Sequence, residues 1–268
     1  MSYADNIRII TETLELCQSS PVLASAIDSS RKSQSIILES ESVPAAQARH
    51  EEQADVIVSR RRSYEAASRY PGQKVAVLNF ASAVSPGGGV LTGCNAQEES
   101  LCRISTLHPC LHVPENWNRF YTPHRQANQR LNNADCIYTP GVVVFRSDDR
   151  EQALLPEEMW YRVDVITCAA PDLRTFAPGA VSAETIDRLH RQRLRRILDL
   201  AYANGAEVVI LGAFGCGAFG NDPAVVSKAM ADVTGEYRRM FRTIEYAVYC
   251  TPRDERNFLA FQAAMAQL

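Results

Sequence analysis

A glycine-rich stretch followed by a short acidic run is the part of the sequence best suited to chemistry. Residues 85–100 read SPGGGVLTGCNAQEES, so three consecutive glycines are followed, after a short spacer, by Gln97, Glu98 and Glu99. Repeated glycine allows backbone N–H groups to approach a ligand closely. A carboxyl group beside such a ligand can give and accept protons. The spacing therefore predicts a loop that holds a substrate next to an acid.

A second glycine-rich segment, GAFGCGAFGNDP at 212–223, has the same character. Both segments follow an apolar run typical of a strand and lead into a run typical of a helix. A helix N-terminus behind a glycine-rich loop favours an anion. Two such loops predict a bridging phosphate group, such as a diphosphate.

Glycine-rich loops of this kind occur in several classes of protein. Glycine also serves ordinary tight turns between strands and helices. Residues 215–220 match the dinucleotide pattern GxGxxG, but no acidic residue ends the next predicted strand, because Glu245 falls inside it. The phosphate-loop ending GK[ST] is missing from the sequence. The pattern therefore argues against a nicotinamide-dependent enzyme and against a P-loop enzyme.

The acidic run also has a structural interpretation. Asn95 could cap a helix, with Glu98 three residues later completing a capping box. This role explains one glutamate but leaves Gln97 and Glu99 without a purpose. Successive helical residues point about 100° apart, so both carboxylates cannot point straight into one pocket. We expect one glutamate to be catalytic and the other to support it.

The elements that must position these residues follow a regular alternation from residue 54 onwards. Because strands alternate with helices, the pattern is typical of βαβ units and a largely parallel sheet covered on both faces. Ligands of such sheets bind where loops leave the carboxyl ends of the strands. The expected strands are 54–60, 74–81, 136–146, 161–170, 207–214 and 243–250; the expected helices are 63–70, one from about residue 96, 182–205, 223–241 and 254–267.

Two regions give a weaker pattern. Residues 5–17 predict an amphipathic helix, whereas the Ser-rich residues 19–44 predict a loop with a short strand around 36–38. The stretch that holds Pro109, Pro114 and Pro123 is expected to be irregular.

Composition limits the function classes. The formal net charge is −3 over 268 residues, so no overall field draws the chain to nucleic acid or to an anionic membrane. Eight cysteines without a CxxC pair and an N-terminus without a signal pattern predict reduced thiols in a cytoplasmic protein. The longest apolar runs are too short for a membrane helix. The segment HPCLH at 108–112 has metal-like residue types, but Pro109 disturbs helical spacing, and we expect no metal.

The combined motifs resemble the bacterial-type poly(ADP-ribose) glycohydrolases, which have a macrodomain fold. The resemblance is carried by PGGG, by QEE after a short spacer, by the preceding VLNFASA and by the later GAFGCGAFGNDP, and it covers most of residues 54–268. It implies an α/β fold, a macrodomain-like three-layer sandwich with a mixed, largely parallel sheet between helices. Residues 1–53 would form an N-terminal helical extension packed on the macrodomain-like domain at 54–268.

The resemblance also implies roles for site residues. Glu99 would be the general acid and base that cleaves the ribose–ribose O-glycosidic bond and releases ADP-ribose, while Glu98 would hold ribose hydroxyls. Gln97 would shape the pocket, and Asn79 would contact a ribose. The implied contacts of the two loops are Gly87, Gly88, Gly89, Val90, Gly215, Cys216, Gly217, Ala218, Phe219, which would pack against the ribose of the nucleotide, and Gly220.

The resemblance implies no cofactor and no metal. The expected partners are poly(ADP-ribose) or ADP-ribosylated proteins as substrates and ADP-ribose as product, in a monomer that binds neither nucleic acid directly nor a membrane. Such an activity reverses ADP-ribosylation, for example in the DNA damage response. Two alternatives stay open: hydrolysis of mono-ADP-ribosylated proteins, and binding of ADP-ribose without catalysis. A pure binding module has no need of paired carboxylates after the glycines.

Overall fold

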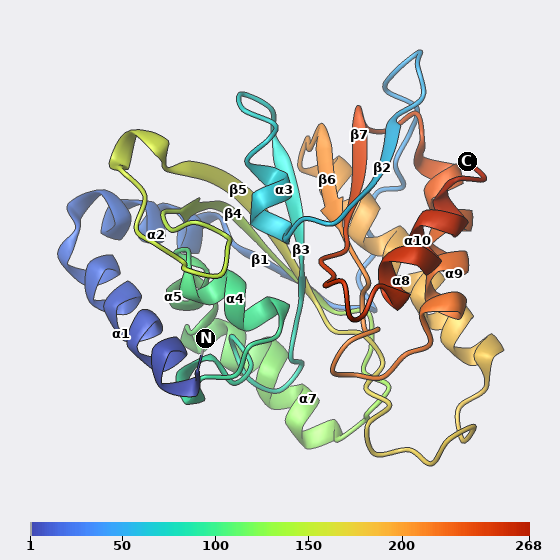
Figure 1. The fold of residues 1–268 in the computed structure, drawn as a ribbon, viewed down its shortest axis with the longest axis horizontal. Coiled ribbons are helices and arrows are strands. Elements are labelled where there is room, and N and C mark those ends of the chain that lie inside the picture. The colour runs from blue at the N-terminus through green and yellow to red at the C-terminus, as the bar shows by residue number, and fades with distance from the viewer. Residues whose placement is uncertain (1) are drawn as a thin grey trace.

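A seven-stranded sheet forms the centre of the protein, seen in a computed structural model that describes residues 2–268 (Figure 1). The strand order is β1-β4-β5-β3-β6-β7-β2. β4 is antiparallel to both of its neighbours, and all other neighbouring strands are parallel. The strands are β1 (Ser35–Ile37), β2 (Asp55–Ser59), β3 (Val75–Phe80), β4 (Cys136–Val144), β5 (Tyr161–Cys168), β6 (Val208–Leu211) and β7 (Thr243–Ala247).

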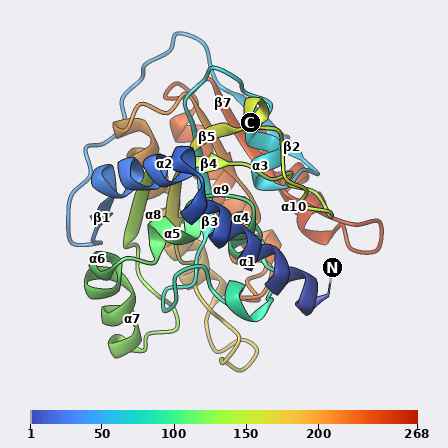
Figure 2. The same ribbon diagram turned by 90° about the vertical axis from the view of Figure 1, so that its left-hand side faces the viewer.

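Helices cover both faces of this sheet and make three layers (Figures 1 and 2). Side chains of β3 alternate between the two faces: Ala76 and Leu78 join the core beneath α8, α9 and α10, whereas Val75 and Val77 join the core beneath α3, α4 and α5. The helices are α1 (Tyr3–Ser19), α2 (Pro21–Ser33), α3 (Ser63–Ala67), α4 (Gln97–Arg103), α5 (Leu107–Leu111), α6 (Pro114–Asn116), α7 (Thr122–Ala127), α8 (Ala183–Ala203), α9 (Pro223–Tyr237) and α10 (Arg256–Met265), with short turns η1 (Val90–Thr92), η2 (Trp117–Tyr121) and η3 (Glu157–Met159).

The expected mixed, largely parallel sheet between helices is confirmed, but the prediction of a loop over residues 19–44 is wrong. Half of this stretch is α2, which begins after the N-cap Ser20 with Pro21 in its first turn. The short strand expected around 36–38 is present as β1. Leu23, Ala26 and Ile27 are buried on one face of the helix. The frequent serines concealed this apolar spacing.

The stretch with three prolines is also more regular than expected. It forms α5, α6, the π-helical turn η2 and α7 in close succession. Pro114 lies in the first turn of α6, where a missing N–H leaves no hydrogen bond unmade. Pro123 lies in the first turn of α7, directly after η2.

The described part of the N-terminal segment belongs to the same packed unit. β1 pairs with β4 at one edge of the sheet, and α2 packs against β4. Met1, with which the predicted extension 1–53 begins, lies outside the described residues. None of the helices within residues 2–268 is both long enough and apolar enough to cross a membrane.

Candidate active site

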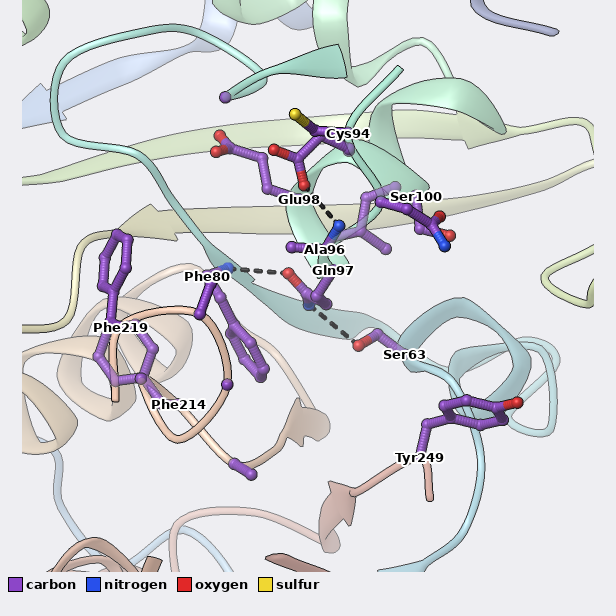
Figure 3. Close-up of a pocket in the computed structure, with 18 of the residues that line it drawn as sticks. Ser63, Phe80, Cys94, Ala96, Gln97, Glu98, Ser100, Phe214, Phe219 and Tyr249 are labelled. Atoms are coloured by element: carbon purple, nitrogen blue, oxygen red, sulfur yellow. Dashed lines mark hydrogen bonds between the residues drawn. The ribbon is translucent and has the colours of Figure 1, made fainter. Parts of the chain in front are cut away.

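The two glycine-rich loops meet at one edge of the sheet. β3 and β6 are parallel neighbours, so the segments that follow them leave at the same side. A cavity of about 810 Å³ opens there (Figure 3). Its wall is made by the end of β3, the first glycine loop, the start of α4, the second glycine loop, the segments that follow β2, β4, β5 and β7, and one residue each of α1 and α10.

The first glycine loop is shaped around the carboxylate of Glu99. Gly87 and Gly88 have φ angles of +71° and +57°, which favour glycine. A Cβ atom on Gly88 would lie 2.5 Å from Glu99 Oε1. The N–H of Gly89 donates to the same oxygen at 3.0 Å. The triple glycine therefore allows the backbone to pass directly over the acidic side chain.

Glu99 is held by backbone donors at both oxygens. Its Oε2 accepts a hydrogen bond of 2.8 Å from the N–H of Ala96, the N-cap residue of α4. The alternative that Asn95 caps the helix and Glu98 completes the box is wrong, because α4 begins one residue later and its third residue is Glu99. Only 8% of Glu99 is exposed, and it lines the cavity.

Glu98 also lines the cavity, and hydrogen bonds from β3 and from the segment just after it hold its carboxyl group. Its Oε1 accepts from Asn79 Nδ2 at 3.2 Å, and its Oε2 accepts from the N–H of Ser82 at 2.7 Å. Burial raises the pKa of Glu98 to about 8, against the hydrogen bonds that favour its charged form. Asn79 is fully buried on β3 and lies outside the cavity wall, so its contact is with Glu98 and with Thr167.

Gln97 fixes the start of α4 to the sheet. Its Oε1 accepts from the N–H of Phe80 at 2.9 Å (Figure 3). Its Nε2 donates to the carbonyl of Leu78 at 2.8 Å and to Ser63 Oγ at 3.0 Å. Because one side chain must both accept and donate, an amide fits this position. The QEE run thus combines one anchor with two carboxyl groups at the cavity wall.

The second glycine loop forms the opposite wall. Gly215 has a φ angle of +81°, and a Cβ there would lie 2.8 Å from the Cβ of Ala170. Asn221 Nδ2 donates to the carbonyl of Gly215 at 3.0 Å and to that of Pro171 at 2.7 Å. Arg174 lies over the ring of Phe219, with Cζ 5.0 Å from its centroid. The loop therefore presents backbone groups and the aromatic rings of Phe214 and Phe219 to the cavity.

The structure brings most of the predicted site residues together. Nine of them line the cavity: Gly88, Gly89, Gln97, Glu98, Glu99, Gly215, Gly217, Ala218 and Phe219. Five do not: Asn79, Gly87, Val90, Cys216 and Gly220. Val90 is buried in the core, while Cys216 and Gly220 face a smaller hollow of about 360 Å³ behind the loop.

Sequence reasoning missed the far end of the cavity. Tyr249 follows β7 and lies across the cavity from Glu98 (Figure 3), with Arg62 Cζ 4.2 Å above its ring. Asp148 Oδ2 accepts from the N–H of Tyr64 at 2.8 Å, while no described residue donates to its buried Oδ1. Burial raises the pKa of Asp148. Arg62 and Tyr249 follow strand ends, which could have indicated them, but nothing in the sequence marks Asp148.

The HPCLH segment lies behind the site. His108 and His112 stack with ring centroids 5.6 Å apart, and a Cβ on Gly87 would touch His108. Within residues 2–268 no group of three or more His, Cys, Asp or Glu side chains is arranged to hold a metal ion.

Comparison with known proteins identifies relatives of this chain. A family model described as "Microbial-type PARG, catalytic domain" matches residues 10–147. The solved structure of poly(ADP-ribose) glycohydrolase from Thermomonospora curvata is 31% identical, with a TM-score of 0.87, covering 97% of this chain and 99% of that chain. The structure of the same enzyme bound to the inhibitor ADP-HPD is 30% identical with a TM-score of 0.84, again covering 97% of this chain and 99% of that chain.

A second solved relative is the poly(ADP-ribose) glycohydrolase from Deinococcus radiodurans in complex with ADP-ribose. It is 30% identical with a TM-score of 0.77, covering 90% of this chain and 97% of that chain. A search of curated proteins finds no match.

Proposed function

This chain belongs to the microbial-type poly(ADP-ribose) glycohydrolases, glycosidases that hydrolyse poly(ADP-ribose), and we propose that Glu99 is the acid and base of the reaction. One observation carries this assignment. Glu99 lies at the cavity wall with both carboxyl oxygens held by backbone N–H groups, so its position relative to a bound ribose is set by the main chain. Preorganisation of this kind is what a proton transfer in a transition state requires.

The proposed reaction breaks the bond between the distal ribose carbon and the oxygen of the next ribose. Glu99 in its protonated form gives its proton to that leaving oxygen while the ribose carbon gains oxocarbenium character. Water then bonds to this carbon and returns a proton to Glu99. The resulting products are free ADP-ribose and a shortened polymer.

Glu98 is proposed to hold the ribose hydroxyls. Burial raises its pKa to about 8, so at neutral pH it offers one O–H donor and one acceptor oxygen. This pair suits two neighbouring hydroxyl groups, each of which both donates and accepts. Asn79 and the N–H of Ser82 would keep the carboxyl group in place, which makes Asn79 a positioning residue.

The rest of ADP-ribose is proposed to extend along the sheet edge. The backbone around Gly215 and Gly217 would hold the diphosphate, and Phe219 would pack on a ribose. The adenine would reach Tyr249, whose ring offers a stacking surface, and Asp148, whose free Oδ1 could accept from the exocyclic amino group. A buried acceptor atom that has no partner at the cavity wall favours a ligand that carries a hydrogen-bond donor at that place.

The test compares ADP-ribose release from poly(ADP-ribosyl)ated and mono-ADP-ribosylated protein, with a chelator present, by wild type and Glu99→Gln. We expect release from the polymer by wild type only, with the affinity for ADP-ribose nearly unchanged in the variant. Release from the mono-modified protein would assign removal of the last unit. Binding without any release would leave an ADP-ribose reader, and a large loss of binding in Glu99→Gln would contradict its role.

We further propose a monomer that works in the cytoplasm and reverses ADP-ribosylation, including after DNA damage. All eight thiols, each within the described residues, are free, which supports a reducing compartment. The molar mass in solution, measured by light scattering coupled to gel filtration, tests whether the protein is a monomer.

A further inference from the structure

The first turn of α1 is fixed against the segment that joins the glycine loop to the carboxylates (Figure 2). Asn6 Nδ2 donates to the carbonyl of Gly93 in a buried hydrogen bond of 2.8 Å. Gly93 has a φ angle of +84°, and a Cβ there would lie 2.6 Å from the carbonyl oxygen of Tyr3. Further along the same helix, Thr13 Oγ1 donates to the carbonyl of Arg103 at 2.6 Å. The position of Tyr3 relative to α4 is therefore determined by the fold.

Tyr3 itself lines the cavity although 67% of it is exposed to solvent. No core cluster includes its ring, so packing within the described residues does not account for it. Ile7, on the same helix, is 41% exposed but is not part of the cavity wall. Among the apolar side chains that α1 exposes, Tyr3 is thus placed to meet a ligand.

The proposed reaction indicates which part of the cavity the leaving unit of the polymer occupies. Glu99 Oε1 accepts from the N–H of Gly89, and a Cβ on Gly89 would approach Cys94 Sγ to 2.5 Å. The retained ADP-ribose would occupy the walls near Gly215 and Tyr249. Cys94 and Tyr3 both line the cavity, and Gly93, beside Cys94, approaches the backbone of Tyr3. The leaving unit would then lie along this part of the wall.

The chemistry of the polymer places a base near this part of the wall. The leaving oxygen is a hydroxyl of an adenosine ribose, and the carbon that bears it is bonded to the carbon that bears adenine. The adenine of the leaving unit therefore stays close to the bond being cut. A tyrosine ring is a suitable partner because bases stack on aromatic side chains.

We propose that Tyr3 is a binding subsite for the leaving unit of poly(ADP-ribose), with its ring stacked on the adenine of that unit. The proposal rests on the glycohydrolase function proposed above. It assigns to the N-terminal helix a direct contact with substrate, in addition to its support of the catalytic segment.

The experiment uses the full chain carrying Glu99→Gln, so that the ligand survives, and compares ADP-ribose with its two-unit oligomer by titration calorimetry. We expect the oligomer to bind about tenfold more tightly than ADP-ribose, a difference in the range of one stacked base. Tyr3→Ala should remove this advantage and leave ADP-ribose affinity unchanged. Tyr3→Phe should retain the advantage, because the ring is kept, and Ile7→Ala serves as the matched control on α1.

Each other outcome overturns the proposal. An oligomer advantage that survives Tyr3→Ala would exclude Tyr3 as the subsite. Equal weakening of both ligands would show that Tyr3 only supports the catalytic segment. Failure of the Glu99→Gln chain to bind ADP-ribose, or its cleavage of the oligomer, would instead contradict the proposed function, which separates the two failures.

Discussion

At the scale of single residues, the site depends on how neighbouring side chains are held. Glu98 and Glu99 are adjacent in sequence, but backbone N–H groups hold both oxygens of Glu99, whereas a buried amide and one N–H hold Glu98. The sequence predicted that one glutamate acts and the other supports. It misplaced the helix cap by one residue, because Ala96 offers no side-chain signal of the helix start.

Asp148 should determine which base the cavity accepts. Its free Oδ1 can accept a hydrogen bond from the amino group of adenine but not from the carbonyl oxygen of hypoxanthine. We expect wild type to prefer ADP-ribose over its hypoxanthine analogue roughly tenfold, the effect of one hydrogen bond. In Asp148→Asn, which can still accept from the N–H of Tyr64, the preference should vanish or reverse because the amide can donate. Equal preferences in both proteins, measured by calorimetry, would rule out this contact.

At the scale of elements, the carboxyl ends of β3 and β6 create the site. The sequence predicted both strands and both loops, since buried parallel strands appear as continuous apolar runs. It could not predict that Gln97 would bond to the end of β3 and to α3, because that contact depends on the packing of three separate elements. The same reason hid the partnership of α1 with the catalytic segment.

Gly88 tests whether the glycine loop is shaped by Glu99. Alanine at its φ angle of +57° adds about 1–2 kcal/mol of backbone strain, and the new Cβ would lie 2.5 Å from the carboxylate. We expect Gly88→Ala to lower kcat/KM on poly(ADP-ribose) roughly a hundredfold, because the acid is displaced. Gly72→Ala is the matched control, since Gly72 has a φ angle of +76° and no described atom within 4 Å of its Cβ. Comparable activity in the two variants would mean that the contact with Glu99 is unimportant.

At the scale of the whole molecule, the alternation of strands and helices was enough to predict three layers and the edge that carries the site. Residues from outside the motifs were not predictable: Asp148 enters from the loop after β4, and Tyr3 enters from the N-terminal helix. Neither lies near a motif, and both reach the cavity only through tertiary packing. Local sequence patterns give elements and loops, whereas long-range packing decides which distant side chains complete a cavity.

Buried ionisable groups on both sides of the sheet also make the stability of the fold depend on pH. Burial lowers the pKa of His108, near the glycine loop, and of His190, on α8, to about 4 from 6.5. Both histidines are therefore neutral when folded, and their contribution to stability is present above pH 6.5 and is lost as the pH falls through 4. Glu98 acts oppositely: its pKa rises from 4.5 to about 8, so its contribution is present below pH 4.5 and is lost as the pH rises through 8.

These three groups predict a stability maximum near pH 6.5. Each group changes the free energy of unfolding by about 1.4 kcal/mol per pH unit within its window. Between pH 4.5 and 6.5 the two histidines outweigh Glu98, so stability should rise with pH. Above 6.5 only Glu98 acts, and stability should fall towards pH 8. Urea titrations at a series of pH values measure this profile of the free energy of unfolding. His108→Leu should flatten the profile below pH 6.5, because no described group bonds the ring nitrogens of His108. Glu98→Gln should flatten the profile above pH 6.5. If both variants kept the wild-type pH profile, burial of these groups would not govern the stability of the protein.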